Sequence, residues 1–384
     1  MNIMNTPMSS ENNTTTHAEV IKLGVDIHAN KYVVARQIDG ASPQAPQRFT
    51  PEQFLTWAKK QTRLAGQVYC CYEAGCFGYV LHRRLEALGV TNFVVRPRNW
   101  DEYGEKVKTD NRDAGELLHH LDRYLAGNRR ALQIVRVPTE KEERQRSESR
   151  QRDSLAKERK RLQNQGNSAA RYYGFSVPAE WWRPKKFAVV CNELPEHLVA
   201  LLEVWHRLLV VIDRELTAAT TRLERSNPRM LPVGLGALTA TILDREVCDW
   251  NRFKNRRQIG GYTGLCPRED SSGGRRQQGS ITKHGNPRIR HVSLEAIWRL
   301  FQFQPNYKPI VYWSERIRSG PPLTKGRKKK IAVALTRQFV VDWWRIQTGR
   351  MKAEEVGLKL GLPMAGSLYK WRKAQAGQGG VATS

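Results

Sequence analysis

Four acidic side chains fall where they can form one metal site, in a chain with few acids for its size. The 384 residues include 37 Asp and Glu against 64 Lys and Arg. Asp26 and Glu73 each end a β-forming run, whereas Asp110 and Asp113 lie three residues apart on one helix face. Four gathered carboxylates repel each other unless a cation lies between them, and their hard oxygens suit Mg²⁺ or Mn²⁺. We therefore expect Asp26, Glu73, Asp110 and Asp113 to be catalytic metal ligands that act on a phosphodiester.

Each of these acids has an ordinary alternative. A single Asp at a strand end is often a turn or cap residue, and Asp113 can pair with Arg112 or Arg123 on its own helix. The four acids in this order, with the first on the first strand, are what favour the metal site. This layout resembles the ribonuclease-H-like fold, in particular a Holliday-junction resolvase of the RuvC type.

A second candidate site is a loop of Gly, Ser and Arg around Ser271 and Ser272. Eleven Lys and Arg and only three acids lie between Arg252 and Arg299. Glycine next to serine lets backbone and hydroxyl approach a phosphate closely, but a serine attacks phosphorus only when a base or metal activates it. From the residues alone, a phosphate-binding loop is favoured over a nucleophile. The expected nucleic-acid-binding residues are Arg268, Arg275, Arg276, Lys283, Arg288, Arg290, Lys328 and Lys329.

The elements that must position the acids form an α/β pattern in the first 137 residues. Residues 20–38 read as two strands joined by a turn at 28–31, and strands follow at 67–73 and 91–95. Helical patterns cover residues 51–64, 77–88 and 108–125. This order predicts a mixed sheet covered by helices.

The rest of the chain reads as mainly helical. Residues 138–162 are almost wholly polar, which predicts a long exposed helix, and residues 198–223 carry a heptad-like seam. The seam is assigned to Leu198, Leu201, Trp205, Leu208, Ile212, Leu216, Ala219 and Leu223. We favour an antiparallel helical hairpin that also assists oligomerisation. Residues 232–240 form a glycine-containing turn into a helix, typical either of an ordinary loop or of a helix-hairpin-helix that contacts DNA phosphates. The predicted segments are a disordered tail (1–18), an α/β domain (19–137), a coiled-coil linker (138–226), a mainly α domain (227–350) and a basic, partly disordered tail (351–384).

The net charge of +27 indicates a polyanionic partner, chiefly nucleic acid, because binding a small acidic molecule in a pocket would not need so large a charge.

No apolar run approaches the length that spans a bilayer, and the polar start lacks a signal-peptide core. We therefore expect no association with a membrane and a cytoplasmic location. The six Cys form no metal-binding pattern and read as reduced thiols. The tryptophan pairs at 181–182 and 343–344, together with Trp313, either stack on unpaired bases or, as is favoured for most of them, fill cores or interfaces.

The two candidate sites together resemble one family. The chain is similar to the transposases of the insertion-sequence 110 family, most of all its 1111 subgroup. The matching stretches carry Gly24-Val25-Asp26, Glu73-Ala74-Gly75, Lys108-Thr109-Asp110 with Asp113, and Ser271-Ser272-Gly273-Gly274 through Lys283-His284-Gly285-Asn286. The resemblance covers roughly residues 20–300.

This resemblance implies a complete reaction. The RuvC-like domain would hold Mg²⁺ through Asp26, Glu73, Asp110 and Asp113. The C-terminal transposase domain would supply a serine nucleophile that links transiently to DNA, and the family pattern assigns it to Ser272, with Ser271 as the alternative. Family members use a structured guide RNA (bridge RNA) that pairs with target and donor DNA. They act as dimers that form tetramers, in which the serine domain of one protomer completes the acidic site of another. A RuvC-like nuclease that hydrolyses DNA with metal-activated water is the alternative.

Overall fold

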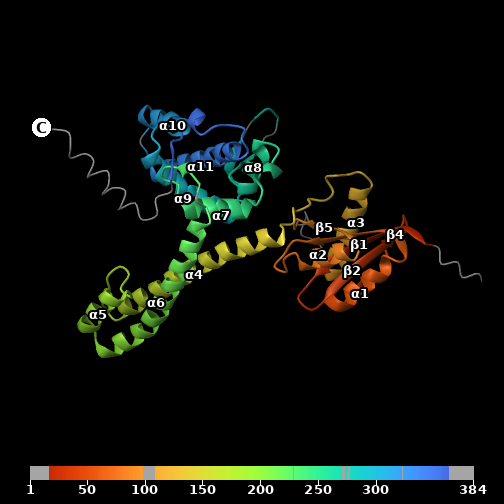
Figure 1. Cartoon of the computed structure of the whole chain (residues 1–384), viewed down its shortest axis with the longest axis horizontal. Coiled ribbons are helices and arrows are strands. Elements are labelled where there is room, and N and C mark those ends of the chain that lie inside the picture. Colours follow the sequence, from red (N-terminus) through yellow and green to blue (C-terminus); the bar gives the residue numbers. More distant parts are fainter. Residues whose placement is uncertain are drawn as a thin grey trace, which may run out of the picture. The chain divides into compact units, whose positions relative to one another are not determined.

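The computed structural model describes residues 17–97, 109–227, 229–269, 273–275, 277–321 and 323–362 (Figure 1). Two compact units, Met1–Val137 and Pro138–Ser384, make up the chain. Most of the two expected terminal tails lies outside the described residues. Strand β1 already begins at Ala18.

The first unit is built on a five-stranded mixed sheet. Its strands are β1 (Ala18–Ile27), β2 (Tyr32–Ile38), β3 (Gln47–Phe49), β4 (Ala65–Glu73) and β5 (Thr91–Val95), in the spatial order β3-β2-β1-β4-β5. β2 runs antiparallel to β1, whereas β4 is parallel to β1 and to β5. The expected mixed α/β arrangement is confirmed. The sequence prediction missed β3, because its three residues, Gln-Arg-Phe, are too few to show an alternating pattern.

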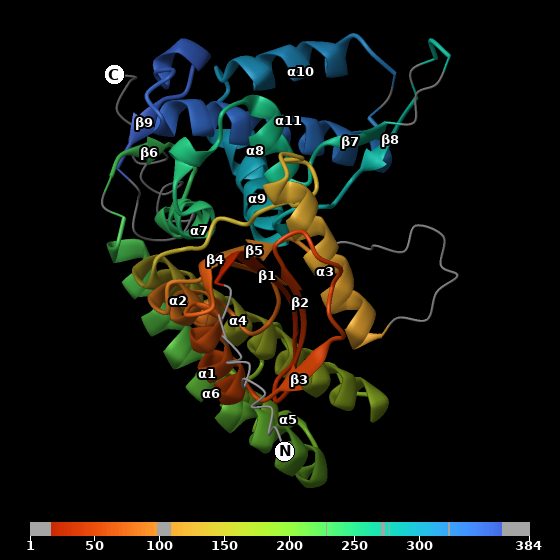
Figure 2. The same ribbon diagram turned by 90° about the vertical axis from the view of Figure 1, so that its right-hand side faces the viewer.

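Helices cover both faces of this sheet (Figure 2). α1 (Pro51–Gln61) and α2 (Val80–Ala87) lie on one face, where Phe54 and Leu85 pack against Leu23 and Val25 of β1. α3 (Asp110–Leu125) lies on the other face. A Cβ atom added at Gly24 would lie 2.3 Å from the backbone oxygen of Ala114. Glycine at this position therefore lets α3 rest directly on the backbone of β1.

Strand alternation decides which side chains face α3. Because successive residues point to opposite faces, Asp26 shares the face of Gly24. Glu73 likewise shares the face of Cys71, whose Sγ donates a hydrogen bond to the Leu117 oxygen on α3 at 3.3 Å. The acids at the ends of β1 and β4 thus lie on the side of the sheet that the N-terminal turn of α3 covers.

Two long helices open the second unit. α4 (Glu140–Tyr172) and α6 (Glu196–Arg225) run antiparallel, since Arg152 bonds to Thr220 while Arg159, further along α4, bonds to Asp213, which comes earlier on α6. α5 (Pro184–Glu193) packs against α6 at the end of the pair that is remote from α7 (Figure 1). The favoured antiparallel hairpin is confirmed. A coiled coil in the strict sense of interlocking knobs and holes stays a prediction.

The predicted seam on α6 is wrong at two positions. Leu201 and Leu208 are 41% and 49% exposed, whereas Leu202 and Leu209, one residue later, are buried. After Leu198, the next buried leucine comes four residues later, at Leu202, whereas the prediction placed it three residues later, at Leu201. Beside it, Leu201, Val204, Leu208 and Val211 form an exposed apolar stripe on the same helix.

The remaining helices pack around a second core. They are α7 (Ala237–Val247), α8 (Arg256–Thr263), α9 (Pro287–Phe303), α10 (Lys308–Arg318) and α11 (Lys325–Gln347), with short 3₁₀ turns at Trp250–Arg252 and Glu354–Val356. Two short ladders join β6 (Leu231–Pro232) to β9 (Leu360–Gly361) and β7 (Pro267–Glu269) to β8 (Gln278–Ile281).

The paired tryptophans belong to these cores. Trp181 and Trp182 are buried in the cluster between α4, α5 and α6, and Trp343 and Trp344 are buried in the core of α7–α11. The favoured core assignment is confirmed, and base stacking by these four side chains is wrong. None of the helices in the described ranges is long and apolar enough to cross a membrane.

Candidate functional site

The acidic site begins where β1 ends and α3 starts. Asp26 is the penultimate residue of β1, and Asp110 is the first residue of α3. The imidazole of His28 lies between them, with Nε2 at 3.0 Å from Asp26 Oδ2 and 3.5 Å from Asp110 Oδ1. Two of the four predicted ligands, 84 residues apart in sequence, therefore meet around one histidine.

The other two predicted ligands are placed by the same elements. β1 and β4 are parallel and pair Val25 with Tyr72, so Asp26 and Glu73 are the next residues along neighbouring strands. Asp113 lies three residues after Asp110, in the same first turn of α3. Its charge acts on Asp26.

The carboxylates of this cluster lie close enough for their negative charges to affect one another. Burial raises the pKa of Asp26 above its usual value; His28 opposes this shift, and the charges of Asp113 and Asp110 add to it. A hydrogen bond from Lys31 Nζ, 2.7 Å from Asp110 Oδ2, lowers the pKa of Asp110. A divalent cation would relieve the repulsion that Asp26 feels, so this donor set fits Mg²⁺ or Mn²⁺.

Sequence reasoning missed His28 and Lys31, which it treated only as turn residues. The turn between β1 and β2 is closed by the His28 N–H, which donates to the Lys31 oxygen at 3.0 Å. The sequence did contain a signal for His28. Because side chains alternate along a strand, a histidine two residues after Asp26 is expected on the same face of the sheet as Asp26, just past the end of β1.

The second candidate site is the hairpin of β7 and β8 and its base. Ser271, Ser272 and Arg276 lie outside the described residues. The base itself is tightly held: Arg290 Nη1 donates to the Thr263 oxygen at 3.0 Å and to the Lys283 oxygen at 3.3 Å. A Cβ atom at Gly285 would lie 2.5 Å from the Tyr262 oxygen, so only glycine fits there without a shift of the backbone. The base of the hairpin is thus anchored to the end of α8.

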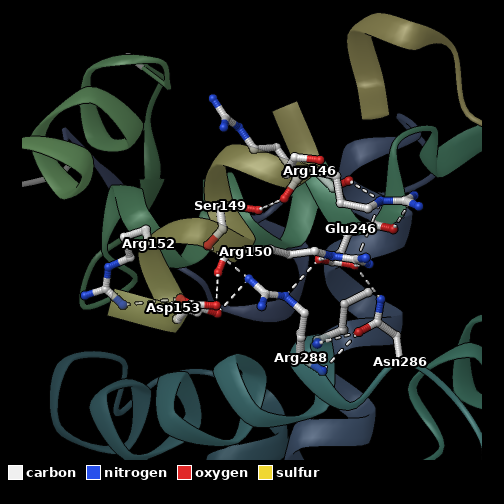
Figure 3. Close-up of polar contacts among 12 residues, drawn as sticks. Arg146, Ser149, Arg150, Arg152, Asp153, Glu246, Asn286 and Arg288 are labelled. Atoms are coloured by element: carbon white, nitrogen blue, oxygen red, sulfur yellow. Dashed lines mark hydrogen bonds and ion pairs between the residues drawn. The ribbon is translucent and has the colours of Figure 1, made fainter. Parts of the chain in front are cut away.

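A buried carboxylate joins this base to α4 (Figure 3). The Glu246 side chain has no exposed surface; Arg150 contacts both its oxygens at 3.0 Å, and Arg288 Nε lies 2.8 Å from Oε1. Asn286 Nδ2 donates to Oε2 at 2.8 Å, while Asn286 Oδ1 accepts from the first backbone N–H groups of α9. Burial acts to raise the pKa of Glu246, but the hydrogen bonds from Arg150 and Asn286 and the charges of Arg150 and Arg288 outweigh it and hold the pKa below its usual value.

The predicted nucleic-acid-binding residues fall into two groups. Arg288 and Arg290 bond to protein groups, since Arg288 also lies 2.6 Å from Asp153 Oδ2. The other described members of the set are exposed: Arg268 and Arg275 on the hairpin, Lys283 at its base, and Lys328 and Lys329 at the start of α11.

Comparison with known proteins decides the family. Residues 232–311, which include the hairpin and Asn286, match the model of the transposase IS116/IS110/IS902 family. The chain is 29% identical over 300 residues to y4rJ of Sinorhizobium fredii, which is named as a candidate transposase. This alignment covers 71% of this chain and 75% of y4rJ. It is 24% identical over 340 residues to the transposase of insertion sequence IS1328 from Yersinia enterocolitica, covering 86% and 97%. It is 24% identical over 243 residues to the IS1111A transposase of Coxiella burnetii, covering 59% and 64%.

The chain belongs to the IS116/IS110/IS902 family of transposases. Transposases are DNA recombination enzymes, so its substrate is DNA. The family model matches only residues of the second unit of this transposase. The alignments with y4rJ and with the IS1328 transposase are longer than the second unit, so they also include part of the first unit, which carries Asp26 and Asp110.

Proposed function

We propose that this transposase cuts and joins DNA strands with two parts, a metal site and a serine nucleophile. Asp26, Glu73, Asp110 and Asp113 hold Mg²⁺ or Mn²⁺, and Ser272 is the nucleophile, with Ser271 as the alternative. The observation that carries the proposal is the meeting of Asp26 and Asp110 around His28, at the edge of the sheet where β4 also delivers Glu73.

The fold of the first unit supports this role. Its mixed sheet, in which β2 is antiparallel and β4 is parallel to β1, agrees with the α/β fold that the resemblance to a RuvC-like domain implies. The first acid, Asp26, lies at the end of the first strand, and the last two, Asp110 and Asp113, lie at the start of α3, which packs on that strand.

The chemistry follows from the two parts. The serine Oγ forms a bond to phosphorus while one ester bond of the DNA backbone breaks, and the serine proton ends on the hydroxyl that leaves. Attack by a hydroxyl end of another strand then reverses these steps, joins the strands and frees the serine. The divalent ions would neutralise the charge that develops on the phosphate oxygens. Arginines on the hairpin would orient the same phosphate.

Nucleic-acid binding is supported by where the basic side chains lie. Lys325 and Arg327–Lys330 form the first turns of α11, and its first turn carries no acid. Cations at a helix N-terminus oppose the helix dipole, so their gathering there favours an anionic partner. We infer that these residues bind the phosphates of target or donor DNA, or of a structured guide RNA. We also propose that the protein is cytoplasmic and associates with the nucleoid when it acts.

Self-association is supported by the exposed stripe on α6. Leu201, Val204, Leu208 and Val211 repeat at steps of three and four residues and are 41–50% exposed. Such a stripe is typical of a helix that pairs with another helix. We therefore propose a homodimer, with tetramers as the active assembly.

Denaturing gels of reactions with labelled DNA test the serine mechanism. The wild type is expected to leave a protein–DNA adduct, which Ser272→Ala abolishes and Ser271→Ala preserves; the opposite result would assign the nucleophile to Ser271. Asp26→Asn is expected to abolish cleavage with DNA binding retained. Cleavage without any adduct, insensitive to both serine variants, would instead support a RuvC-like nuclease that uses metal-activated water.

A further inference from the structure

We infer that His28 is a nitrogen ligand of the metal site, so that the site binds Mn²⁺ more tightly than Mg²⁺. The inference rests on the metal site proposed above and adds a ligand to it. It starts from a group of three side chains, Asp26, His28 and Asp110, each offering one ligand atom, all within 4.8 Å of one another.

The distances fit adjacent corners of a coordination sphere. Neighbouring ligand atoms of an octahedral ion with bonds of about 2.1 Å lie about 3.0 Å apart. His28 Nε2 lies 3.0 Å from Asp26 Oδ2 and 3.5 Å from Asp110 Oδ1. One imidazole nitrogen and two carboxylate oxygens, from two segments of the chain, therefore already converge as a cation would require.

Lys31 explains which oxygen of Asp110 faces the metal. Its ammonium contacts Oδ2 at 2.7 Å, while Oδ1 of the same carboxylate lies toward His28. Lys31 can thus hold the carboxylate in place without occupying the side that faces the imidazole. The backbone hydrogen bond between His28 and Lys31 keeps both side chains on one tight turn, so the two contacts are set by the same hairpin.

The ligand type determines the preferred ion. Mg²⁺ takes oxygen ligands and keeps several waters, whereas an imidazole nitrogen favours transition metals. A set of carboxylates alone would accept Mg²⁺ and Mn²⁺ nearly alike. One nitrogen in the set shifts the preference toward Mn²⁺.

Pulsed electron paramagnetic resonance of the full-length protein with Mn²⁺ and no nucleic acid tests this directly. The wild type is expected to show the ¹⁴N modulation of a bound imidazole, and His28→Ala is expected to lose it. The same substitution should weaken Mn²⁺ binding about tenfold or more in calorimetric titrations, and Mg²⁺ binding much less. His119→Ala is the matched control, because His119 is an exposed histidine on α3 itself.

Each outcome bears on a different claim. Persistence of the ¹⁴N signal in His28→Ala, or equal Mn²⁺ affinity of that variant and the wild type, would overturn the role of His28. Asp26→Asn separates this from the site itself: it should abolish binding of both ions. If Asp26→Asn binds Mn²⁺ as the wild type does, the carboxylate site is wrong, and His28 loses its role with it.

Discussion

Asp26 combines burial with two neighbouring negative charges, so its ionised form is costly in the metal-free protein. Its pKa in the folded state lies above the ordinary value of 3.8. The unfolded chain therefore releases this proton at lower pH than the folded chain does. Between the two pKa values the folded state loses stability as the pH rises, and the loss persists at neutral pH. A bound divalent cation reverses the effect, because it favours the carboxylate.

Asp26→Asn is accordingly expected to raise the melting temperature of the metal-free protein at neutral pH and to remove the stabilisation that Mn²⁺ gives the wild type. Thermal unfolding with and without Mn²⁺ measures both. Glu116→Gln serves as the control, since Glu116 is 51% exposed on α3 and outside the cluster. The electrostatic account would be contradicted if Asp26→Asn were less stable than the wild type without metal and were stabilised by Mn²⁺ as much as the wild type is.

At the scale of elements, Glu246 ties α4 and α7 to the start of α9. It is fully buried with Arg150 and Arg288 on its two oxygens, and Asn286 extends the contact to the α9 N-terminus (Figure 3). Removing one partner of a buried ion pair leaves uncompensated charges, which costs about 3–5 kcal/mol.

Glu246→Ala should therefore destabilise the second unit by about 3–5 kcal/mol in urea unfolding followed by circular dichroism. Glu148→Ala is the matched control: Glu148 also pairs with an arginine, Arg245, but is 61% exposed, and such pairs contribute about 0–1 kcal/mol. Similar losses in the two variants would show that burial of Glu246 does not set its contribution.

The same elements show what the sequence could and could not reveal. The order of strands and helices in the first unit was predictable, because alternation and helix periodicity are local patterns. The shared direction of Asp26 and Glu73 follows from strand parity only once the structure shows that Gly24 and Cys71 face α3. The partners of Glu246 were not predictable, since Arg150 and Arg288 come from helices about 100 and 40 residues away in sequence, and only packing brings them together. The error at Leu201 and Leu208 has a related cause: a seam shifted by one residue matches the same apolar pattern.

At the scale of the whole molecule, the net charge of +27 predicts binding to nucleic acid that weakens steeply with salt. Each lysine that neutralises a phosphate releases about one counterion, so it adds about one to the slope of log K against log salt. The charge does not by itself say which lysines act in this way. The start of α11 is the candidate, because Lys328 and Lys329 are exposed there and the helix dipole opposes them.

Lys328→Ala with Lys329→Ala is therefore expected to lower that slope by about two, as measured by fluorescence anisotropy of a labelled duplex over a salt series. The pair Lys59→Ala and Lys60→Ala removes the same charge from exposed positions at the end of α1, where the dipole already favours cations, and should leave the slope unchanged. If both double variants lowered the slope equally, binding would depend on total charge rather than on a phosphate site at α11. The lysines of α11 would then act only as part of the net positive charge of the protein.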